Sequence, residues 1–446
     1  MTGKRVSRRE FGRRAAGTLA AFHIVPRHVL GRGYRAPSDT LSIACIGVGG
    51  MGRTDVTGVS GETIHALCDV DWKAAEDAFL SYPRAKRYRD FRELLDREAK
   101  NIDAVTVSTA DHTHGVIAMA AMKAGKHVYC QKPLARTLHE VRALMAEAGR
   151  RPGQATQMGN QGHAMEGTRL IREWVEAGLI GAVREVHYWT DRPIWPQAID
   201  RPTDAHNVPP WLDWELWLGP AADRPYNPAY APFRWRGWWD FGTGALGDIA
   251  CHAMDAAFWA LDLGFPSRIA AESTRLYAET APKASRIEYD FPPKGGRPAV
   301  RVVWRDGGIL PPRPPQVAAD AKWPPSMEGG QLWVGDAGAL VAGMYGQDPK
   351  LLDEAKQAEV TATPLPVKYP RTEGVYKEWI AAAKAGTQPG SNFAGHAGPL
   401  TEMVLIGNLA VRLARPLELD PATGAVRSPT VPPELVTPVS REGWGI

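Results

Sequence analysis

Residues 47–52 read G-V-G-G-M-G, the G-x-G-x-x-G spacing that can hold the pyrophosphate of a dinucleotide. The chemistry needs Gly47 for a tight turn, Gly49 so that backbone N–H groups can approach the phosphates, and Gly52 for close helix packing. The phosphates would then lie at the positive end of the following helix. Glycine-rich turns are common, so the motif depends on its context. The cofactor-binding residues predicted here are Gly47, Gly49, Gly50, Met51 and Gly52.

An acidic residue at the expected distance provides that context. The apolar run Leu41–Ile46 predicts a strand that leads into the glycine turn, and Thr63–Cys68 predicts a second strand that ends at Asp69. Asp69 lies 22 positions after Gly47, where a carboxylate can accept hydrogen bonds from the adenosine ribose hydroxyls. Because an acid there would repel a 2′-phosphate, NAD is the expected cofactor, with NADP as the alternative.

Strands and helices continue to alternate along the chain. The apolar run Ile102–Ser108 follows the helical pattern of Phe91–Lys100. The run His127–Cys130 follows a predicted helix over Val116–Ala124, which Gly125 ends as a C-cap glycine should. This alternation predicts a parallel, doubly wound sheet of the α/β class.

Residues 109–114, T-A-D-H-T-H, follow the third strand at the edge where such sheets bind ligands. Thr109, His112 and His114 are predicted to line the cofactor site. The H-x-H spacing invites a metal interpretation, but no further ligands accompany it. Asp111 is interpreted as a helix N-cap and the two histidines as loop residues, so no metal site is predicted.

The charge of the chain is unevenly distributed. Residues 1–36 hold nine Lys or Arg and one acid, so this segment carries +8 and leaves −4 on the rest of a chain with net charge +4. A slightly acidic body lacks the basic surface that binds phosphate backbones, so nucleic acid is excluded as an expected partner. At 446 residues the chain is long enough for two domains, and no apolar run is long enough to predict a membrane span.

The basic segment contains the twin arginines Arg8-Arg9, followed by the apolar stretch Ala15–Val25. It resembles a Tat export signal, although Gly12 stands where the usual pattern has Leu. The alternative is a disordered basic arm. We expect a leader over residues 1–37, recognition by the Tat export machinery, and a periplasmic or other extracytoplasmic location.

Four cysteines show no Cys-x-x-Cys spacing and stand in apolar or motif-adjacent contexts, which predicts buried thiols and no disulfide framework. They are Cys45, Cys68, Cys130 and Cys251.

Residues 125–134, G-K-H-V-Y-C-Q-K-P-L, carry a resemblance to a known family. The chain resembles the Gfo/Idh/MocA oxidoreductases, from about Leu41 to about Asp420. In that family the motif is Glu-Lys-Pro and the lysine reaches both cofactor and substrate, which implies these contacts for Lys132. Gln131 replaces the usual glutamate, and an amide would hold the lysine charged less strongly. Gln131 and Lys132 are both predicted to contact the cofactor.

A second signature of the family is a glycine-rich start of a helix that carries Asp-x-x-x-His, and residues 242–252 match it with Asp248 and His252. Positions i and i+4 share one helix face, so both side chains can meet one substrate. The ordinary pKa of histidine, about 6.5, lies close to neutral pH, so His252 is suited to act as the base that removes a hydroxyl proton. Asp248 would orient the substrate or the imidazole, and Lys132 would stabilise the developing alkoxide.

The resemblance implies a Rossmann domain over residues 38–158, ending in a strand at Gln154–Met158, and a second domain over residues 159–446. The second is expected to be α+β with a large, mostly antiparallel open sheet, whose open face joins subunits into a dimer or tetramer. Its clearest predicted strands are Val183–Thr190, Arg268–Tyr277, Ala299–Trp304 and Gln331–Val334.

Eight of the 16 tryptophans fall between residues 189 and 239. Most are expected to pack a long Pro-rich excursion against the sheet, while one or two could stack on a sugar ring. The predicted substrate contacts are His163, Arg192, Trp195 and Trp239.

The leading functional hypothesis is an enzyme that transfers hydride between tightly bound NAD(P) and a small carbohydrate: a sugar, cyclitol or related polyol. One alternative is an NAD-dependent glycosidase that works by transient oxidation and elimination. An alternative from another class is a non-catalytic sugar-binding protein, which the set Lys132, Asp248 and His252 argues against.

Overall fold

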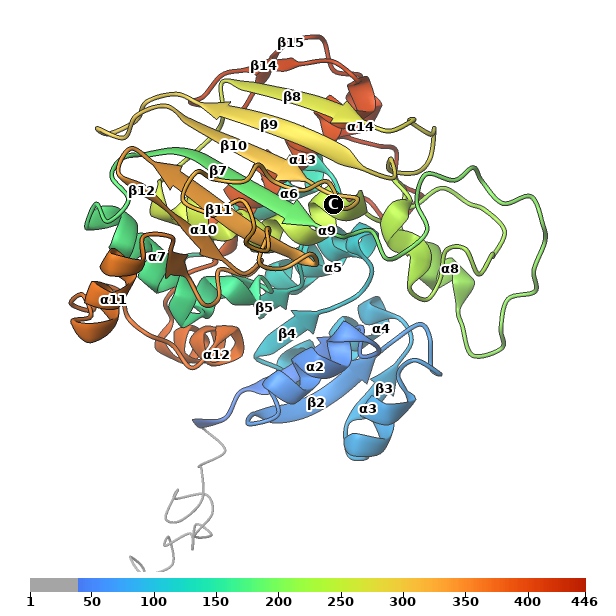
Figure 1. The fold of residues 1–446 in the computed structure, drawn as a ribbon. Coiled ribbons are helices and arrows are strands. Elements are labelled where there is room, and N and C mark those ends of the chain that lie inside the picture. Colours follow the sequence, from blue (N-terminus) through green and yellow to red (C-terminus); the bar gives the residue numbers. More distant parts are fainter. Residues whose placement is uncertain (1–38) are drawn as a thin grey trace, which may run out of the picture. The chain divides into compact units, whose positions relative to one another are not determined.

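The first sheet of the computed structural model, which describes residues 39–446, has six strands that all pair in parallel (Figure 1). The predicted parallel, doubly wound sheet is therefore confirmed. Its central strands are short. Helices cover both faces of the sheet, so the side chains of these strands are almost wholly apolar. In spatial order they are β3 (Lys86–Tyr88), β2 (Thr63–Cys68), β1 (Ser42–Ile46), β4 (Ala104–Val107), β5 (His127–Cys130) and β6 (Thr156–Met158).

Helices connect these strands, and their ends follow local capping chemistry. Asp90 caps one helix by accepting from Arg92 N, and Thr137 forms a capping box with Glu140 on another. The helices are α2 (Met51–Gly58), α3 (Glu76–Ser81), α4 (Phe91–Glu98), η3 (Ala99–Asn101), α5 (Asp111–Lys123) and α6 (Leu138–Gly149).

Helix α5 begins earlier than predicted. Asp111 is its first residue and Ala110 its N-cap, so the interpretation of Asp111 as the N-cap is wrong. The Asp111 carboxylate instead accepts a hydrogen bond from Thr243 Oγ1 at 2.9 Å. As a result His112 and His114 lie in the first helical turn and are buried, whereas the sequence placed them in a loop.

The second sheet has nine strands, and all its pairs are antiparallel except β7 with β10. This confirms the mostly antiparallel sheet. Its spatial order is β13 (Lys350–Leu351), β12 (Gly338–Ala342), β11 (Gly329–Gly335), β7 (Val183–Thr190), β10 (Val300–Arg305), β9 (Ser285–Phe291), β8 (Arg268–Ser273), β14 (Leu417–Leu419) and β15 (Val426–Ser428).

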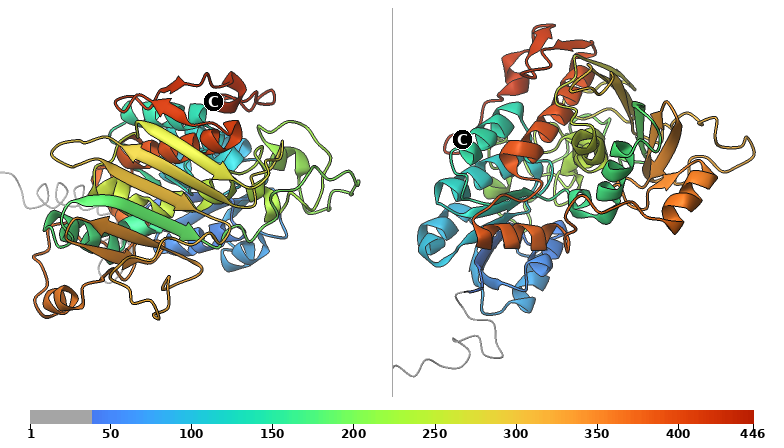
Figure 2. Two further views of the ribbon diagram at one scale, coloured as in Figure 1. Left: turned by 45° about the horizontal axis from the view of Figure 1, so that its top comes forward. Right: turned by 90° about the vertical axis from the view of Figure 1, so that its left-hand side faces the viewer.

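The two faces of this sheet differ. Helices cover one face of the sheet (Figure 2). Apolar side chains of its strands, such as Tyr188, Tyr289 and Trp304, are fully buried in the core. The other face carries alternating charges, including the ion pair of Arg301 with Asp290 at 2.9 Å. The helices of this part of the chain are η4 (Gln161–Ala164), α7 (Glu166–Glu176), α8 (Trp214–Leu218), η5 (Arg234–Gly237), α9 (Gly244–Ala253), α10 (Asp255–Ala260), α11 (Glu354–Ala362), α12 (Val375–Ala385), η6 (Phe393–Ala397), α13 (Gly398–Leu413) and α14 (Pro433–Val436).

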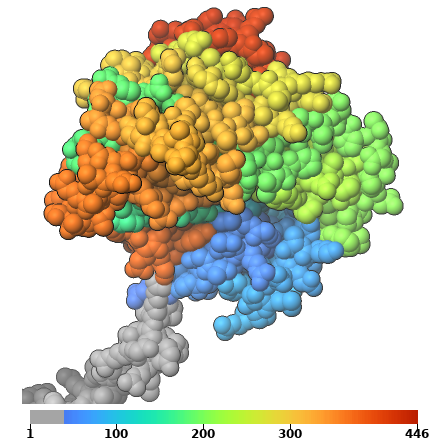
Figure 3. All heavy atoms as spheres, in the orientation of Figure 1, coloured from blue at the N-terminus to red at the C-terminus, as the bar shows by residue number. Residues whose placement is uncertain are grey.

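The tryptophan-rich excursion over residues 191–240 packs into a core of its own. Trp214 and Trp217 stack with ring centroids 4.8 Å apart, and Trp238 is fully buried with them. The excursion also contacts the first domain, where the backbone N–H of Trp72, after β2, donates a hydrogen bond to Trp211 O at 3.1 Å. Figure 3 shows it in green at the surface beside the blue residues of the first domain. Four of the eight tryptophans, Trp214, Trp217, Trp235 and Trp238, thus pack within the excursion itself, whereas the sequence predicted that most of them pack it against the sheet.

All four cysteines are buried and free, as predicted. None of the helices within residues 39–446 is long and apolar enough to cross a membrane. The twin-arginine prediction falls on residues 1–38, which lie outside the described residues.

Candidate active site

A cavity of about 780 Å³ opens where the carboxyl ends of β1, β2 and β4 face α9. Its size is that of a site for a cofactor together with a small substrate. Most of the residues predicted for cofactor or substrate line it. They are Gly47, Gly49, Gly50, Met51, Asp69, Thr109, His112, His114, Gln131, Lys132, Arg192, Trp195, Asp248 and His252.

The glycine turn at residues 47–52 forms a cradle that side chains would fill. Gly47 has φ +77°, and a Cβ there would lie 2.6 Å from the carbonyl carbon of Ser108. Gly52 does not line the cavity, because its Cα faces the turn: a Cβ would come within 2.0 Å of Gly47 O. Gly50 faces open space, since a Cβ added there would have no atom within 4 Å. This arrangement fits a pyrophosphate held by backbone N–H groups.

Asp69 both faces the cavity and holds the glycine turn. Its Oδ2 accepts from Val48 N at 2.8 Å and Gly49 N at 3.2 Å, and its Oδ1 accepts from Asp71 N at 2.8 Å. Burial raises the pKa of Asp69, and these backbone hydrogen bonds oppose that shift. Since a carboxylate has about four acceptor positions, capacity remains for ribose hydroxyls.

The two histidines of α5 stabilise the floor of the cavity. His112 Nε2 lies 2.8 Å from Trp217 O, and His114 Nδ1 lies 2.8 Å from Pro133 O. Burial lowers the pKa of His112 to about 3 and that of His114 to about 4, so both rings are neutral at neutral pH. His114 thereby ties α5 to the Lys-Pro segment that positions Lys132.

Lys132 and Asp248 form the polar centre of the cavity. Lys132 Nζ lies 2.8 Å from Asp248 Oδ1 and 2.8 Å from the Asp248 carbonyl oxygen. Arg236 Nε donates to the same Oδ1 at 3.2 Å. Burial would raise the pKa of Asp248, but the charges of Lys132 and Arg236 outweigh it and lower the pKa to about 2. Asp248 is therefore a carboxylate held between two cations.

His252 follows Asp248 by one turn of α9 and is buried. Its Nδ1 has no hydrogen-bond partner among the described residues, and its ring lies 4.6 Å from that of Tyr345. Burial, with the charge of Lys132, lowers the pKa of His252 to about 3. The expectation of an ordinary histidine pKa is thus wrong, because the sequence does not show how completely the ring is buried.

Gln131 does not contact the lysine ammonium. Its amide nitrogen donates to both oxygens of the buried Asp55, at 2.9 and 3.0 Å, and Tyr376 Oη donates to Asp55 Oδ1 at 2.7 Å. Burial raises the pKa of Asp55 to about 6. The carboxylate that pairs with Lys132 is Asp248, so the loss of the family glutamate leaves the lysine with an acidic partner.

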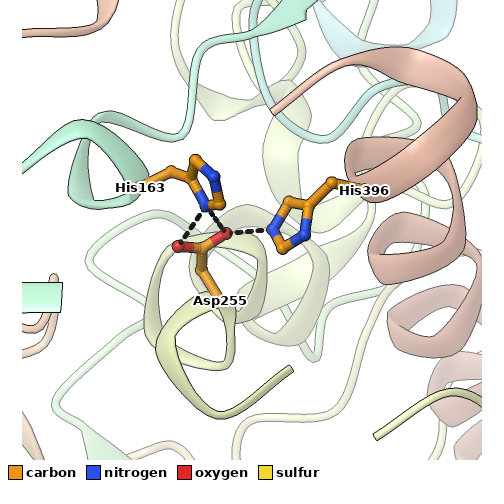
Figure 4. A group of neighbouring side chains, drawn as sticks. All are labelled: His163, Asp255 and His396. Carbon is orange, nitrogen blue, oxygen red and sulfur yellow. Dashed lines mark hydrogen bonds and ion pairs between the residues drawn. The ribbon is translucent and has the colours of Figure 1, made fainter. Parts of the chain in front are cut away.

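His163 was predicted to contact substrate, but it does not line the cavity. Its Nδ1 lies 3.1 Å from both oxygens of Asp255, and His396 Nε2 lies 2.6 Å from Asp255 Oδ1 (Figure 4). Asn160 also donates to Asp255 at 2.7 Å. All of these side chains are buried, so the group links η4, α10 and η6 in the interior.

Among residues 39–446, the side chains of His163, Asp255 and His396 could also offer ligand atoms to a metal ion, because these atoms lie within 4.8 Å of one another. The separations of 2.6 and 3.1 Å are those of direct hydrogen bonds. We therefore describe His163, Asp255 and His396 as a hydrogen-bonded network.

Trp239 was also predicted to contact substrate, and it too lies outside the main cavity. It lines a separate cavity of about 130 Å³. Its carbonyl accepts from Arg136 Nη1 at 2.8 Å, and the Arg412 guanidinium lies 5.1 Å from its ring centroid. Its backbone and its ring thus contact arginines, Arg136 and Arg412, outside the main cavity.

Several cavity residues were not identified from the sequence. Arg236, Tyr345 and Asp111 come from η5, a loop after β12 and the first turn of α5. Burial and the charge of Asp248 raise the pKa of Asp111 to about 7. No spacing motif links these residues. The one available signal was Asp111, three residues after the predicted strand Ile102–Ser108, and it was interpreted as a helix cap.

Comparison with known sequences agrees with this geometry. Residues 41–158 match the profile described as "Oxidoreductase family, NAD-binding Rossmann fold", and residues 172–296 match "Oxidoreductase family, C-terminal alpha/beta domain". The two matches together span more than half of the chain. The chain belongs to the Gfo/Idh/MocA oxidoreductase family, and its first domain is an NAD-binding Rossmann domain.

Inositol dehydrogenases are among its relatives. The chain is 35% identical to inositol 2-dehydrogenase 2 of Saccharopolyspora erythraea over 153 residues, which is 33% of this chain and 44% of that protein. It is 28% identical to inositol 2-dehydrogenase of Salmonella typhimurium over 153 residues, 33% of this chain and 45% of the relative. The match thus covers less than half the length of these relatives.

Solved structures share the fold over most of the chain. WlbA dehydrogenase of Bordetella pertussis, in complex with NADH and UDP-GlcNAcA, has a TM-score of 0.58 at 16% identity, covering 85% of this chain and 99% of that one. A levoglucosan dehydrogenase in complex with NADH and levoglucosan has a TM-score of 0.56 at 18% identity, with the same coverage of 85% and 99%.

Proposed function

We propose that this protein is an NAD-dependent oxidoreductase that acts on a CH–OH group of a sugar, cyclitol or related polyol. The observation that carries the proposal is one cavity that contains both the glycine cradle and the group Lys132, Asp248 and His252. A sugar-binding protein without catalysis would not need an ammonium, a carboxylate and an imidazole in the same cavity as a cofactor-binding glycine turn.

The residues divide the work of the reaction. When bound, NAD⁺ supplies the acceptor for the hydride that leaves the carbinol carbon. Lys132 donates a hydrogen bond to the substrate oxygen and stabilises its negative charge. His252 takes the hydroxyl proton. Burial and, to a smaller extent, the charge of Lys132 lower its pKa to about 3 and keep it neutral beforehand, and the negative charge that develops on the substrate oxygen offsets the lysine contribution. Asp248 holds Lys132 in place.

A substrate panel tests this proposal. Purified protein is incubated with NAD⁺ and free sugars, cyclitols and glycosides, and reduced cofactor is followed by its absorbance near 340 nm. We expect NADH with at least one member of the panel, and formation about 10²–10³-fold slower with the Lys132→Ala variant. Binding of a sugar without any turnover, in single-turnover as well as steady-state assays, would contradict it and favour the binding protein.

A redox-neutral glycosidase is the second candidate, because exposed apolar side chains at the mouth of the cavity offer a place for a leaving group. In that reaction the hydride removed from the sugar returns to it after elimination, so cofactor is not consumed. Release of the aglycone without net NADH would identify it.

We further propose export by the Tat machinery and a location outside the cytoplasm, on the basis of Arg8-Arg9. A protein there has no nicotinamide pool to draw on, so NAD would have to be loaded before export and kept. Denaturing the purified protein and quantifying released nucleotide by chromatography tests retention. Cofactor-free protein that needs millimolar NAD would contradict both parts.

The charged outer face of the nine-stranded sheet supports a proposal of self-association as a dimer or tetramer. Arg286 pairs with Glu288 on the same strand, β9, and Arg301 of β10 pairs with Asp290 of β9. Such a mixed pattern can complement itself across a two-fold axis. Light scattering of wild type and an Arg301→Glu variant tests it; a wild-type monomer would overturn it.

A further inference from the structure

What we call the apolar rim, at the solvent side of the cavity, consists of four residues: Ile194, Trp195, Pro232 and Phe233. Ile194 is 62% exposed and Phe233 is 45% exposed, although both are large hydrophobic residues that line the same cavity as Lys132. Pro232 is exposed beside them, and Trp195 forms the buried base, with its ring 6.3 Å from that of Phe233. Apolar side chains left in water at a cavity mouth mark a binding surface.

The rim is fixed to the polar centre through Arg236. The Arg236 guanidinium lies 4.6 Å from the Phe233 ring centroid and 5.9 Å from that of Trp195, and its Nη1 donates to Phe233 O at 3.1 Å. Its Nε donates to Asp248 Oδ1. One arginine side chain therefore lies between Phe233 and Trp195 of the apolar rim and the carboxylate that holds Lys132.

From this arrangement we propose that the substrate is a glycoside whose apolar or aromatic aglycone binds on the apolar rim while its sugar reaches Lys132. A free sugar or cyclitol has hydroxyls around its ring and would gain little from Ile194 and Phe233. An aromatic group attached to that sugar would cover both side chains and remove them from water. This inference rests on the proposed function, whose substrate class it narrows.

The test compares three forms of each sugar in the panel: the free sugar, its methyl glycoside and its 4-nitrophenyl glycoside. We expect kcat/KM of the wild-type holoenzyme to be highest for the 4-nitrophenyl form. Ile194→Ser and Phe233→Ser should each lower the ratio of kcat/KM for the 4-nitrophenyl form to that for the methyl form by about tenfold, the usual result of losing roughly 1.4 kcal/mol of apolar burial. Val439→Ser, at a position 92% exposed outside the cavity, is the matched control.

The outcomes separate this inference from the proposed function. Oxidation of free sugars with no preference for aryl glycosides, or an unchanged ratio in both variants, overturns the inference and leaves the oxidoreductase proposal intact. No oxidation of any form contradicts the proposed function; binding of the same probes to the NAD-loaded protein, measured by calorimetry, then decides the inference. Equal affinity for all three forms overturns it. Dissociation of an oligomer by Phe233→Ser would assign the rim to a second copy of the chain instead.

Discussion

Two groups of histidine and aspartate are built around carboxylates on consecutive helices, Asp248 on α9 and Asp255 on α10, and they have opposite surroundings. Asp248 on α9 bonds to the cations Lys132 and Arg236, beside His252, whose Nδ1 has no partner among the described residues. Asp255 on α10 accepts from Asn160 and contacts two histidines, and none of this second group lines the cavity.

The comparison shows that residue type does not decide role. Both carboxylates are buried, and neighbouring groups lower the pKa of each against the effect of burial. The difference is access and unmet bonding capacity: Lys132 and His252 face a cavity, whereas Asp255 is sealed among its partners. The first group can meet a ligand, and the second can only hold elements together.

The largest expected effect comes from removing the cation of the first group. Lys132→Ala should lower kcat by about 10²–10³-fold, the usual result of removing a donor that stabilises an oxyanion. Lys123→Ala, at an exposed position in the last turn of α5, is the control and should keep full activity. Equal activity of the two variants would show that Asp248 and Lys132 are as structural as the second group.

His252→Ala should lower kcat by about 10²-fold, the contribution of a positioned base. NAD affinity, measured by fluorescence titration, should change little because the base acts on the substrate. If instead the cofactor dissociates while kcat at saturating NAD is retained, His252 is a positioning residue for the cofactor.

His163→Ala should have the opposite profile. It leaves a buried carboxylate with fewer hydrogen bonds, which costs about 1–3 kcal/mol of the free energy of unfolding. The expected result is a lower Tm in a thermal melt with kcat/KM near that of the wild type at low temperature. A kcat loss as large as that of His252→Ala, at unchanged Tm, would erase the distinction between the two groups.

Acid should weaken the fold through its buried neutral histidines. The pKa values of His252 and His112 are lowered from 6.5 to about 3 and that of His114 to about 4. Below 6.5 the unfolded chain protonates these histidines and the folded chain does not, so their contribution to the free energy of unfolding falls as pH falls. Each such histidine should contribute about 1 kcal/mol to the difference between urea denaturations at pH 7 and 5.5, and the raised pKa values of Asp111 and Asp55 oppose this contribution. His112→Asn should reduce this difference, and the exposed His206→Asn should not.

The smallest change is expected at the cofactor. Asp69→Asn keeps one oxygen acceptor for the backbone N–H groups, replaces the other with an amide nitrogen and removes the charge. It should weaken NAD binding several-fold while improving the relative affinity for NADP. Affinities for both cofactors, compared by calorimetry, give the ratio. An unchanged ratio would contradict the ribose-binding role of Asp69.

The sequence by itself determined the elements whose signals are local. Apolar runs such as Thr63–Cys68 and His127–Cys130 became strands with the same bounds, and the glycine turn with Asp69 lies where the motif predicts. Such signals depend only on neighbouring residues and on strand or helix periodicity. The short strands β3 and β13 to β15 were missed because two or three residues carry no period, and the longer strands β9 and β12 were also not predicted.

Only the tertiary structure decided which polar residues share a space. His163 and Trp239 were expected in the cavity and lie outside it, while Arg236 and Tyr345 line it without any motif. The low pKa of His252 also followed from burial by segments far away in the chain. Burial and charge pairing depend on distances between such segments, and spacing along the chain does not contain them.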